Sequence, residues 1–205
     1  MSDLARWFPV ARNLNLPCVF TLLNAGFGAV GVALAAQRCP RAALTCVALA
    51  IPCDIVDGWL ARRRQQSSAF GAQLDSLADV ISFVLLPAMI ALSVDPSPRT
   101  ALPAAAWVLA GVLRLARFAV VGTAGSGSDE RFEGVPTAFA AAAFVTIFAV
   151  ARWLPSTWGV GLVAAYLAAL APAMVSVLPF PKRGPIRAAM WILVPLAVVL
   201  AWRAP

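Results

Sequence analysis

Four aspartates stand inside two long apolar stretches of the sequence, where charged side chains are rare. Asp54 and Asp57 are three residues apart and Asp75 and Asp79 are four apart, so each pair lies on one face of a helix. A charge at mid-membrane costs on the order of 2.5–3.5 kcal/mol, and clustered carboxylates repel one another unless positive charge compensates them. Because oxygen ligands suit Mg²⁺, Mn²⁺ and Ca²⁺, the spacing predicts a four-carboxylate cage for divalent metal.

A short polar turn at residues 63–70 connects the two apolar stretches. It makes the two helices antiparallel, which brings both aspartate pairs to a similar depth. Two alternatives compete with the metal cage: structural salt bridges to Arg62, Arg63 and Arg64, and a proton or cation pathway in a transporter. A pathway would spread its ionisable groups across the membrane, whereas these four gather at one side. Helix capping is a poor explanation for two pairs inside apolar helices.

The composition excludes an ordinary soluble domain. The 205 residues are 61% hydrophobic and 12% charged, whereas a soluble domain carries about a quarter charged residues. The net charge of +7 suits anionic lipid headgroups and phosphate-bearing substrates better than nucleic acid. Four cysteines without a CxxC pair, together with the lack of histidine, argue against a zinc site or a disulfide framework. Residues 1–12 show no signal-peptide pattern.

The hydropathy pattern predicts an all-α integral membrane protein with six to seven transmembrane helices. Residues 1–16 are expected to form an amphipathic helix that lies on the membrane surface, and residues 17–205 to form the transmembrane domain. Each spanning helix needs about 20 apolar residues, and Pro, Gly, Ser and charged residues divide the domain. The candidate spans are residues 17–36, 42–62, 71–94, 101–122, 134–153, 157–178 and 185–203. Whether the last segment crosses is left open.

The basic residues predict the orientation. With a cytoplasmic N-terminus, eleven of the sixteen fall on the cytoplasmic side and five on the other, as the positive-inside rule favours. The aspartates lie near the cytoplasmic ends of their helices. We therefore expect a protein of the cytoplasmic (inner) membrane whose active site faces the cytoplasm.

The aspartates belong to a longer motif, D-x2-D-G-x2-A-R-x8-G-x3-D-x3-D, which spans residues 54–79. Its fixed positions are Asp54, Asp57, Gly58, Ala61, Arg62, Gly71, Asp75 and Asp79. The motif matches every fixed position of the signature of the CDP-alcohol phosphotransferase family, and the chain resembles that family on these residues. The resemblance implies a membrane enzyme that transfers a phosphatidyl group from CDP-diacylglycerol to an alcohol and releases CMP.

The resemblance assigns roles to the aspartates that spacing alone does not. It implies that Asp54, Asp57 and Asp75 are metal ligands, and that Asp79 is the catalytic base close to a second metal, which it also contacts. The cofactor is then two Mg²⁺ or Mn²⁺ ions, with Ca²⁺ a candidate inhibitor. With no histidine in the chain, a carboxylate is the expected group to take the proton of the acceptor hydroxyl.

A nucleotide site is expected beside the metal. Small residues at 58 and 61 leave room for the nucleotide against the helix backbone, and the fork of donors on Arg62 suits a phosphate or the cytosine edge. The segment at residues 17–24 resembles the N-terminal entry of the family. The expected nucleotide-binding residues are Gly58, Ala61, Arg62, Gly71, Thr21 and Asn24.

Other segments resemble the phosphatidylserine synthase branch, which implies L-serine as the acceptor. They are residues 74–83 (LDSLADVISF), 113–118 (LRLARF), 132–137 (FEGVPT) and 174–182. Cys18, Ala119 and Leu178 depart from that branch, and lost polar groups near a pocket change which headgroup is satisfied. The alternatives are the same chemistry with glycerol phosphate, inositol phosphate or an amino alcohol and, more distantly, a non-catalytic transporter or scaffold.

Two further features concern the acceptor and the assembly. Arg114 and Arg117 are expected to bind the serine carboxylate or a substrate phosphate, the alternative being that they are only positive-inside anchors. Residues 122–131 form either a lid over the acceptor or a plain linker. The resemblance implies a homodimer among membrane lipids, with no nucleic-acid partner, and stretches such as 104–106 and 140–143 permit close helix packing.

Overall fold

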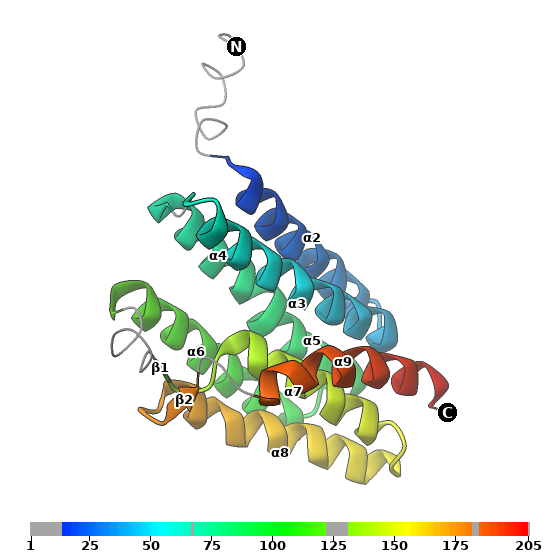
Figure 1. Ribbon diagram of the computed structural model, residues 1–205. Coiled ribbons are helices and arrows are strands. Elements are labelled where there is room, and N and C mark those ends of the chain that lie inside the picture. The colour runs from blue at the N-terminus through cyan, green and yellow to red at the C-terminus, as the bar shows by residue number, and fades with distance from the viewer. Residues whose placement is uncertain (1–13, 67, 122–130, 182–184, 205) are drawn as a thin grey trace.

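The chain folds into a bundle of helices that lie mostly alongside one another (Figure 1). The computed structural model describes residues 14–66, 68–121, 131–181 and 185–204. The proposed surface helix at residues 1–16 and the proposed lid at residues 122–131 therefore fall almost wholly outside the described residues.

The first two helices are a closely packed antiparallel pair, α2 (Leu16–Ala36) and α3 (Pro40–Arg63). At the start of α2, the Asn15 side chain accepts a hydrogen bond from the backbone N–H of Cys18 at 3.1 Å, as a helix cap does. Proline stands in the first turn of both helices, where its missing N–H costs nothing. At the other end, Arg62 and Arg63 in the last turn of α3 suit the negative end of the helix dipole.

The third apolar segment, expected as a span at residues 71–94, is one helical stretch from Ala69 to Val94 with a wider turn inside it. It consists of α4 (Ala69–Asp79), the π-helical segment η2 (Val80–Leu85) and α5 (Leu86–Val94). Pro87 lacks the N–H that a regular ladder would use, and the indole of Trp107 donates to the Val84 carbonyl at 3.0 Å. The wider turn begins directly after Asp79, and π-helical turns are frequent at functional sites.

The described residues of the second half form four more helices and one small sheet. The helices are α6 (Pro98–Val121), α7 (Thr137–Ala151), α8 (Ser156–Val175) and α9 (Pro185–Arg203). The strands β1 (Arg131–Glu133) and β2 (Pro179–Pro181) pair antiparallel, with residue 132 opposite residue 180. No sequence pattern predicted this sheet. It lies at the same end of the bundle as the start of α4 (Figure 1).

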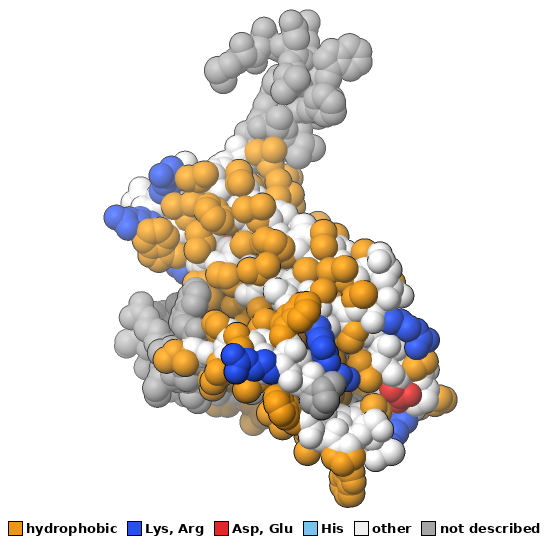
Figure 2. All heavy atoms as spheres, turned by 90° about the vertical axis from the view of Figure 1, so that its right-hand side faces the viewer, with side chains coloured by type: hydrophobic (Ala, Val, Ile, Leu, Met, Phe, Trp, Pro, Cys, Tyr) orange, Lys and Arg blue, Asp and Glu red, His pale blue; other side chains and the backbone are white. Residues whose placement is uncertain are grey.

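The structure is that of an all-α integral membrane protein. Among the described residues, five helical segments are long and apolar enough to cross a membrane, and α7 and the second part of α9 are shorter apolar helices. Hydrophobic side chains cover much of the face shown in Figure 2, with a few basic side chains among them. The expectation of six to seven spans is compatible with these helices, and the number that cross stays a prediction.

Buried aromatic side chains hold the centre of the bundle together. Trp107 is fully buried, and its ring centroid lies 5.9 Å from that of Tyr166. The Tyr166 hydroxyl donates to the Ala140 carbonyl at 2.7 Å, so this buried polar group is satisfied. These contacts join α6, α7 and α8; Arg114 of α6 and Thr137 of α7 interact with Asp79.

Candidate active site

Three of the four motif aspartates gather at one place. Asp54 and Asp57 come from the last turns of α3, and Asp75 comes from α4, which follows after a short turn. One carboxylate oxygen from each lies within 4.8 Å of the other two, so the group could hold a metal ion. The antiparallel meeting of two helix faces, expected from the spacing, is what brings these oxygens together.

The electrostatic state of this group also fits a cation. Within the described part of the chain, the buried atoms Asp57 Oδ2 and Asp75 Oδ1 have no hydrogen-bond partner. A buried carboxylate oxygen without a partner costs about 1–3 kcal/mol or more, and such atoms are rare in folded proteins. A divalent cation between the carboxylates would satisfy these oxygens and offset their mutual repulsion, so the residues present fit the implied metal.

Asp79 differs from the other three, because its carboxylate meets hydrogen-bond donors from two other helices. It is 8% exposed. The Asn24 amide of α2 donates to Oδ1 at 3.5 Å, and the Thr137 hydroxyl of α7 donates to Oδ2 at 3.4 Å. Asp79 still interacts electrostatically with the other aspartates and with Arg114. Among the described residues, the group of three close oxygen ligands does not include Asp79. The expected four-carboxylate cage is therefore a group of three aspartates with Asp79 separate from it.

Helix α2 supports the site more directly than the sequence suggested. Thr21 is buried; its hydroxyl donates to the Pro17 carbonyl at 3.3 Å and lies close enough to Asp57 to interact with that carboxylate. The backbone carbonyl of Asn24 accepts a hydrogen bond from Ser82 at 2.9 Å, which ties it to η2. This approach depends on Gly28, where an added Cβ would collide with Ser82 Oγ. The expected nucleotide-binding residues Thr21 and Asn24 thus contact the aspartates themselves.

The remaining expected nucleotide-binding residues lie on the side of the metal group toward the α3–α4 turn. Gly58 and Ala61 are partly exposed, and a Cβ at Gly58 would lie 3.3 Å from Nη1 of Arg62. Arg62 is exposed and interacts electrostatically with Asp57. Gly71 has a local structural role, because its N–H donates to the Ser68 hydroxyl at 3.0 Å and starts α4. An open surface with a cation therefore adjoins the aspartates.

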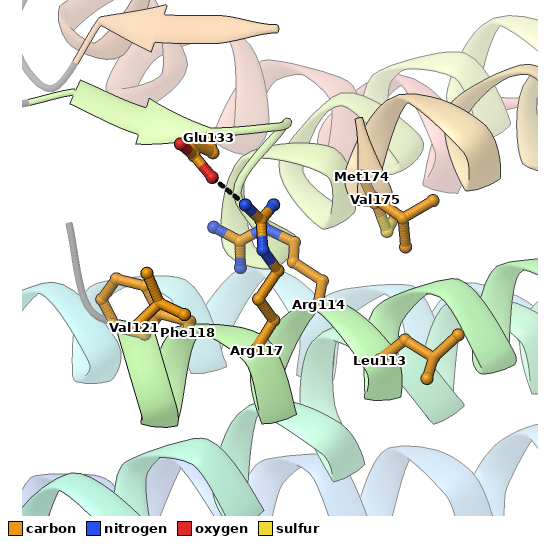
Figure 3. A pocket seen from close by; sticks show the side chains of 8 residues that line it. All are labelled: Leu113, Arg114, Arg117, Phe118, Val121, Glu133, Met174 and Val175. Carbon is orange, nitrogen blue, oxygen red and sulfur yellow. Dashed lines mark hydrogen bonds and ion pairs between the residues drawn. The ribbon is translucent and has the colours of Figure 1, made fainter. Parts of the chain in front are cut away.

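A pocket of about 280 Å³ lies between α6, β1 and the end of α8. Figure 3 shows Arg114 and Arg117 projecting from α6 toward β1, where Arg117 forms an ion pair with Glu133. Arg114 is 8% exposed, and its Nε has no hydrogen-bond partner among the described residues. The two arginines expected near the acceptor thus do line one pocket. They differ, since one is buried and the other is exposed and paired.

Two residues of this region were not singled out from the sequence, Glu133 and Thr137. Both belong to the stretch at residues 132–137, which was noted only as a resemblance. Gly134 between them has a φ of +73°, and a Cβ there would collide with the Met174 carbonyl. Its N–H donates to the Leu178 carbonyl at 2.9 Å. A polar residue on either side of a Gly-x-Pro turn was the available signal.

Comparisons with known proteins agree with this geometry. The sequence model of the CDP-alcohol phosphatidyltransferase family matches residues 14–202. The archaetidylserine synthase of Methanothermobacter thermautotrophicus is 37% identical over 132 residues, which cover 62% of this chain and 55% of that protein. The CDP-diacylglycerol–serine O-phosphatidyltransferase of Mycobacterium leprae is 32% identical over 159 residues, covering 72% and 53%.

A shorter relative aligns over most of its length. The CDP-diacylglycerol–serine O-phosphatidyltransferase of Bacillus subtilis is 28% identical over 169 residues, which cover 81% of this chain and 89% of that protein. By contrast, this chain spans about half the length of the archaeal and mycobacterial relatives. The match to the family model covers nearly the whole chain and includes the aspartate motif, which confirms the resemblance seen in the sequence. The chain therefore belongs to the CDP-alcohol phosphatidyltransferase family.

Proposed function

We propose that this protein transfers a phosphatidyl group from CDP-diacylglycerol to the hydroxyl of L-serine, giving phosphatidylserine and CMP, in a divalent-metal-dependent reaction. The observation that carries the proposal is the group of three aspartates whose oxygens lie within 4.8 Å of one another, two of them with a buried oxygen that lacks a partner. The names of the relatives support serine as the acceptor.

Asp54, Asp57 and Asp75 would hold Mg²⁺ or Mn²⁺, and Asp79 would contact a second ion. When bound, the ions would neutralise the pyrophosphate of the donor and the charge that develops on the departing CMP. Carboxylates are the ligands that such hard cations prefer. The protein supplies fixed oxygens from two helices, so little reorganisation is needed when the donor enters.

Asp79 is the proposed base. It takes the proton from the acceptor hydroxyl as that oxygen forms a bond to the phosphorus that carries the diacylglycerol. The bond from this phosphorus to the bridging oxygen of the pyrophosphate breaks, and CMP leaves with the electron pair. Hydrogen bonds from Asn24 and Thr137 orient the carboxylate, and a base must lie within hydrogen-bond reach of the proton it takes.

The donor nucleotide would lie along the exposed face of α3 and the start of α4. Arg62 provides a cation beside the small residue Gly58, which suits a phosphate oxygen or the cytosine edge. The proposed nucleotide-binding residues are Gly58, Ala61, Arg62, Gly71, Thr21 and Asn24. Arg114 and Arg117 would bind the acceptor or a substrate phosphate.

The cellular setting follows from the same features. We place the protein in the cytoplasmic (inner) membrane with the aspartates facing the cytoplasm, because basic residues concentrate on that side. The transmembrane domain would span residues 17–205, preceded by a surface helix at residues 1–16. A homodimer is proposed from the family resemblance.

An acceptor panel tests the function. Purified full-length protein in detergent or nanodiscs receives CDP-diacylglycerol, Mn²⁺ or Mg²⁺, and one labelled alcohol at a time. We expect serine-dependent release of CMP and formation of phosphatidylserine. Turnover with glycerol phosphate, inositol phosphate or an amino alcohol in place of serine would contradict the acceptor assignment. Failure to release CMP with every acceptor and both metals would contradict the proposed chemistry.

A further inference from the structure

The pocket in Figure 3 carries an uneven set of charges. Arg117 and Glu133 are paired with each other at the rim, with side chains 45% and 36% exposed. Arg114 lies deeper, and its buried Nε has no partner within the described residues. The pocket thus offers a buried cation with one unpartnered nitrogen inside and a carboxylate near its mouth.

The rest of the lining is apolar. It consists of Leu113, Phe118, Val121, Met174 and Val175. The hydroxyl groups of a polyol acceptor would lose their hydrogen bonds to water against this apolar lining and find no new hydrogen-bond partners. Burying an unpaired polar group is costly. A phosphate-bearing alcohol would bring two negative charges close to Glu133 and be repelled. The ligand that complements the pocket is small and carries one anionic and one cationic group.

We propose that Glu133 binds the ammonium group of the acceptor amino acid, while Arg114 binds its carboxylate. This inference rests on the proposed function and deepens it, because it names the residue that selects an amino acid over other alcohols. Arg114 also interacts electrostatically with Asp79. An acceptor bound by Arg114 would therefore lie on the side of the pocket nearer the proposed base.

The backbone fixes Glu133 at this place. Glu133 is the last residue of β1, opposite Pro179 of β2. The next residue, Gly134, donates its N–H to the carbonyl of Leu178, which lies in the segment between α8 and β2. Glu133 is therefore fixed at the pocket, where the ammonium group of an acceptor bound to Arg114 would meet its carboxylate. Arg117 holds the carboxylate in the absence of acceptor and can share it, because one carboxylate accepts several hydrogen bonds.

The competing explanation is that Glu133 has a purely structural role in its ion pair with Arg117. Exposed ion pairs contribute little to stability, so this role would be a small one. Comparing L-serine with 3-hydroxypropionate, which is the same molecule without the ammonium group, separates the two. In full-length Glu133→Gln we expect the KM for L-serine to rise about 10- to 100-fold, as for loss of a hydrogen bond to a charged group. The KM for CDP-diacylglycerol and the binding constant of 3-hydroxypropionate, measured by competition, should not change. Glu133→Asp should recover part of the serine affinity.

Arg117→Gln breaks the same ion pair without removing the carboxylate; it can weaken both ligands, but it should keep the preference for L-serine over 3-hydroxypropionate that Glu133→Gln loses. If Glu133 only positions Arg117, both variants will weaken L-serine and 3-hydroxypropionate equally, and the inference is wrong. It is also wrong if Glu133→Gln leaves the serine KM unchanged while the wild type is active with serine; the proposed function would then stand. A second readout needs no turnover: L-serine should raise the melting temperature of the wild type more than that of Glu133→Gln.

Discussion

The two ends of the third apolar segment carry aspartates in opposite states. Asp75 stands near its start and Asp95 directly after its end, about 30 Å apart at 1.5 Å per residue. Asp95 accepts hydrogen bonds from the hydroxyls of Thr100 and Ser97, each at 2.7 Å, and from the Ser97 N–H at 3.2 Å. Asp75 keeps a buried oxygen without a partner.

The difference shows how to tell a structural carboxylate from a functional one. The partners of Asp95 lie within five residues of it in sequence, so a local turn satisfies it and starts α6. The aspartates at the other end come from separate helices, and no local turn satisfies the buried oxygens of Asp57 and Asp75. The far end also has a cavity of about 240 Å³. A cavity alone is therefore a weaker indicator of chemistry than unsatisfied carboxylates.

The strongest test of this comparison exchanges aspartate for asparagine at each end. Asp57→Asn and Asp75→Asn should each lower the rate of CMP release about a thousandfold, because metal ligation supplies several kcal/mol of transition-state stabilisation. Asp95→Asn should keep the wild-type rate. The assay is release of labelled CMP with saturating L-serine. Comparable losses at both ends would break the distinction.

Metal binding without turnover is the next effect in size. Mn²⁺ at a hundred times its Kd should stabilise the folded protein by about 2.7 kcal/mol, because it satisfies the unpartnered oxygens of Asp57 and Asp75. EDTA should remove the stabilisation. Thermal unfolding in detergent measures it, with Asp75→Asn as the variant expected to lose it and Asp95→Asn as the control. Equal stabilisation of both variants by Mn²⁺ would place the cation elsewhere.

Thr137→Val tests the hydrogen bonds that orient Asp79. Loss of a hydrogen bond to a charged group costs about 1.5–3 kcal/mol, so kcat should fall about 10- to 100-fold. The KM for CDP-diacylglycerol should change little, because Thr137 contacts the proposed base. Thr137→Ser retains the hydroxyl and should restore most of the activity. A serine variant as slow as the valine variant would show that packing is responsible.

Two glycines on α2 give a matched pair for the packing beneath the site. A Cβ at Gly28 would collide with Ser82, whose hydroxyl holds Asn24, whereas nothing lies within 4 Å of a Cβ at Gly26. Gly28→Ala should destabilise the protein by about 1–3 kcal/mol and lower kcat. Gly26→Ala should be neutral or stabilise by up to about 1 kcal/mol. Thermal unfolding and kcat are measured for both variants. Equal effects of Gly28→Ala and Gly26→Ala would contradict the importance of the α2–η2 contact.

The smallest effect concerns pH at the far end. Hydrogen bonds from Thr100 and Ser97 lower the pKa of Asp95 below its ordinary value. A lowered pKa in the folded state contributes stability that is present above the unfolded pKa of about 3.9 and is lost as pH falls through the folded value. The melting temperature should therefore separate wild type from Asp95→Asn above about pH 5, and the gap should close in more acidic buffer. A gap that does not depend on pH would contradict this linkage.

The sequence by itself determined the elements and the family. The apolar segments predicted the helices, because helix formation in a membrane depends on local hydropathy and on hydrogen bonds within each segment. The spacing predicted that all four aspartates converge, because an antiparallel pair joined by a short turn leaves little freedom. Asp54, Asp57 and Asp75 do so, whereas Asp79 is not in the group of close oxygen ligands among the described residues. The motif predicted the family, which the match over residues 14–202 confirms. The roles of the individual site residues stay predictions.

Only the tertiary structure decided how the fourth aspartate is held. Asn24 and Thr137 are 55 and 58 residues from Asp79 in sequence, and helical periodicity says nothing about contacts between helices that far apart. Trp107 of α6 donates a hydrogen bond to the π-helical segment, and Glu133 of β1 pairs with Arg117 of α6. These features arise from packing between distant segments, and local sequence patterns predict the segments without fixing how their faces meet.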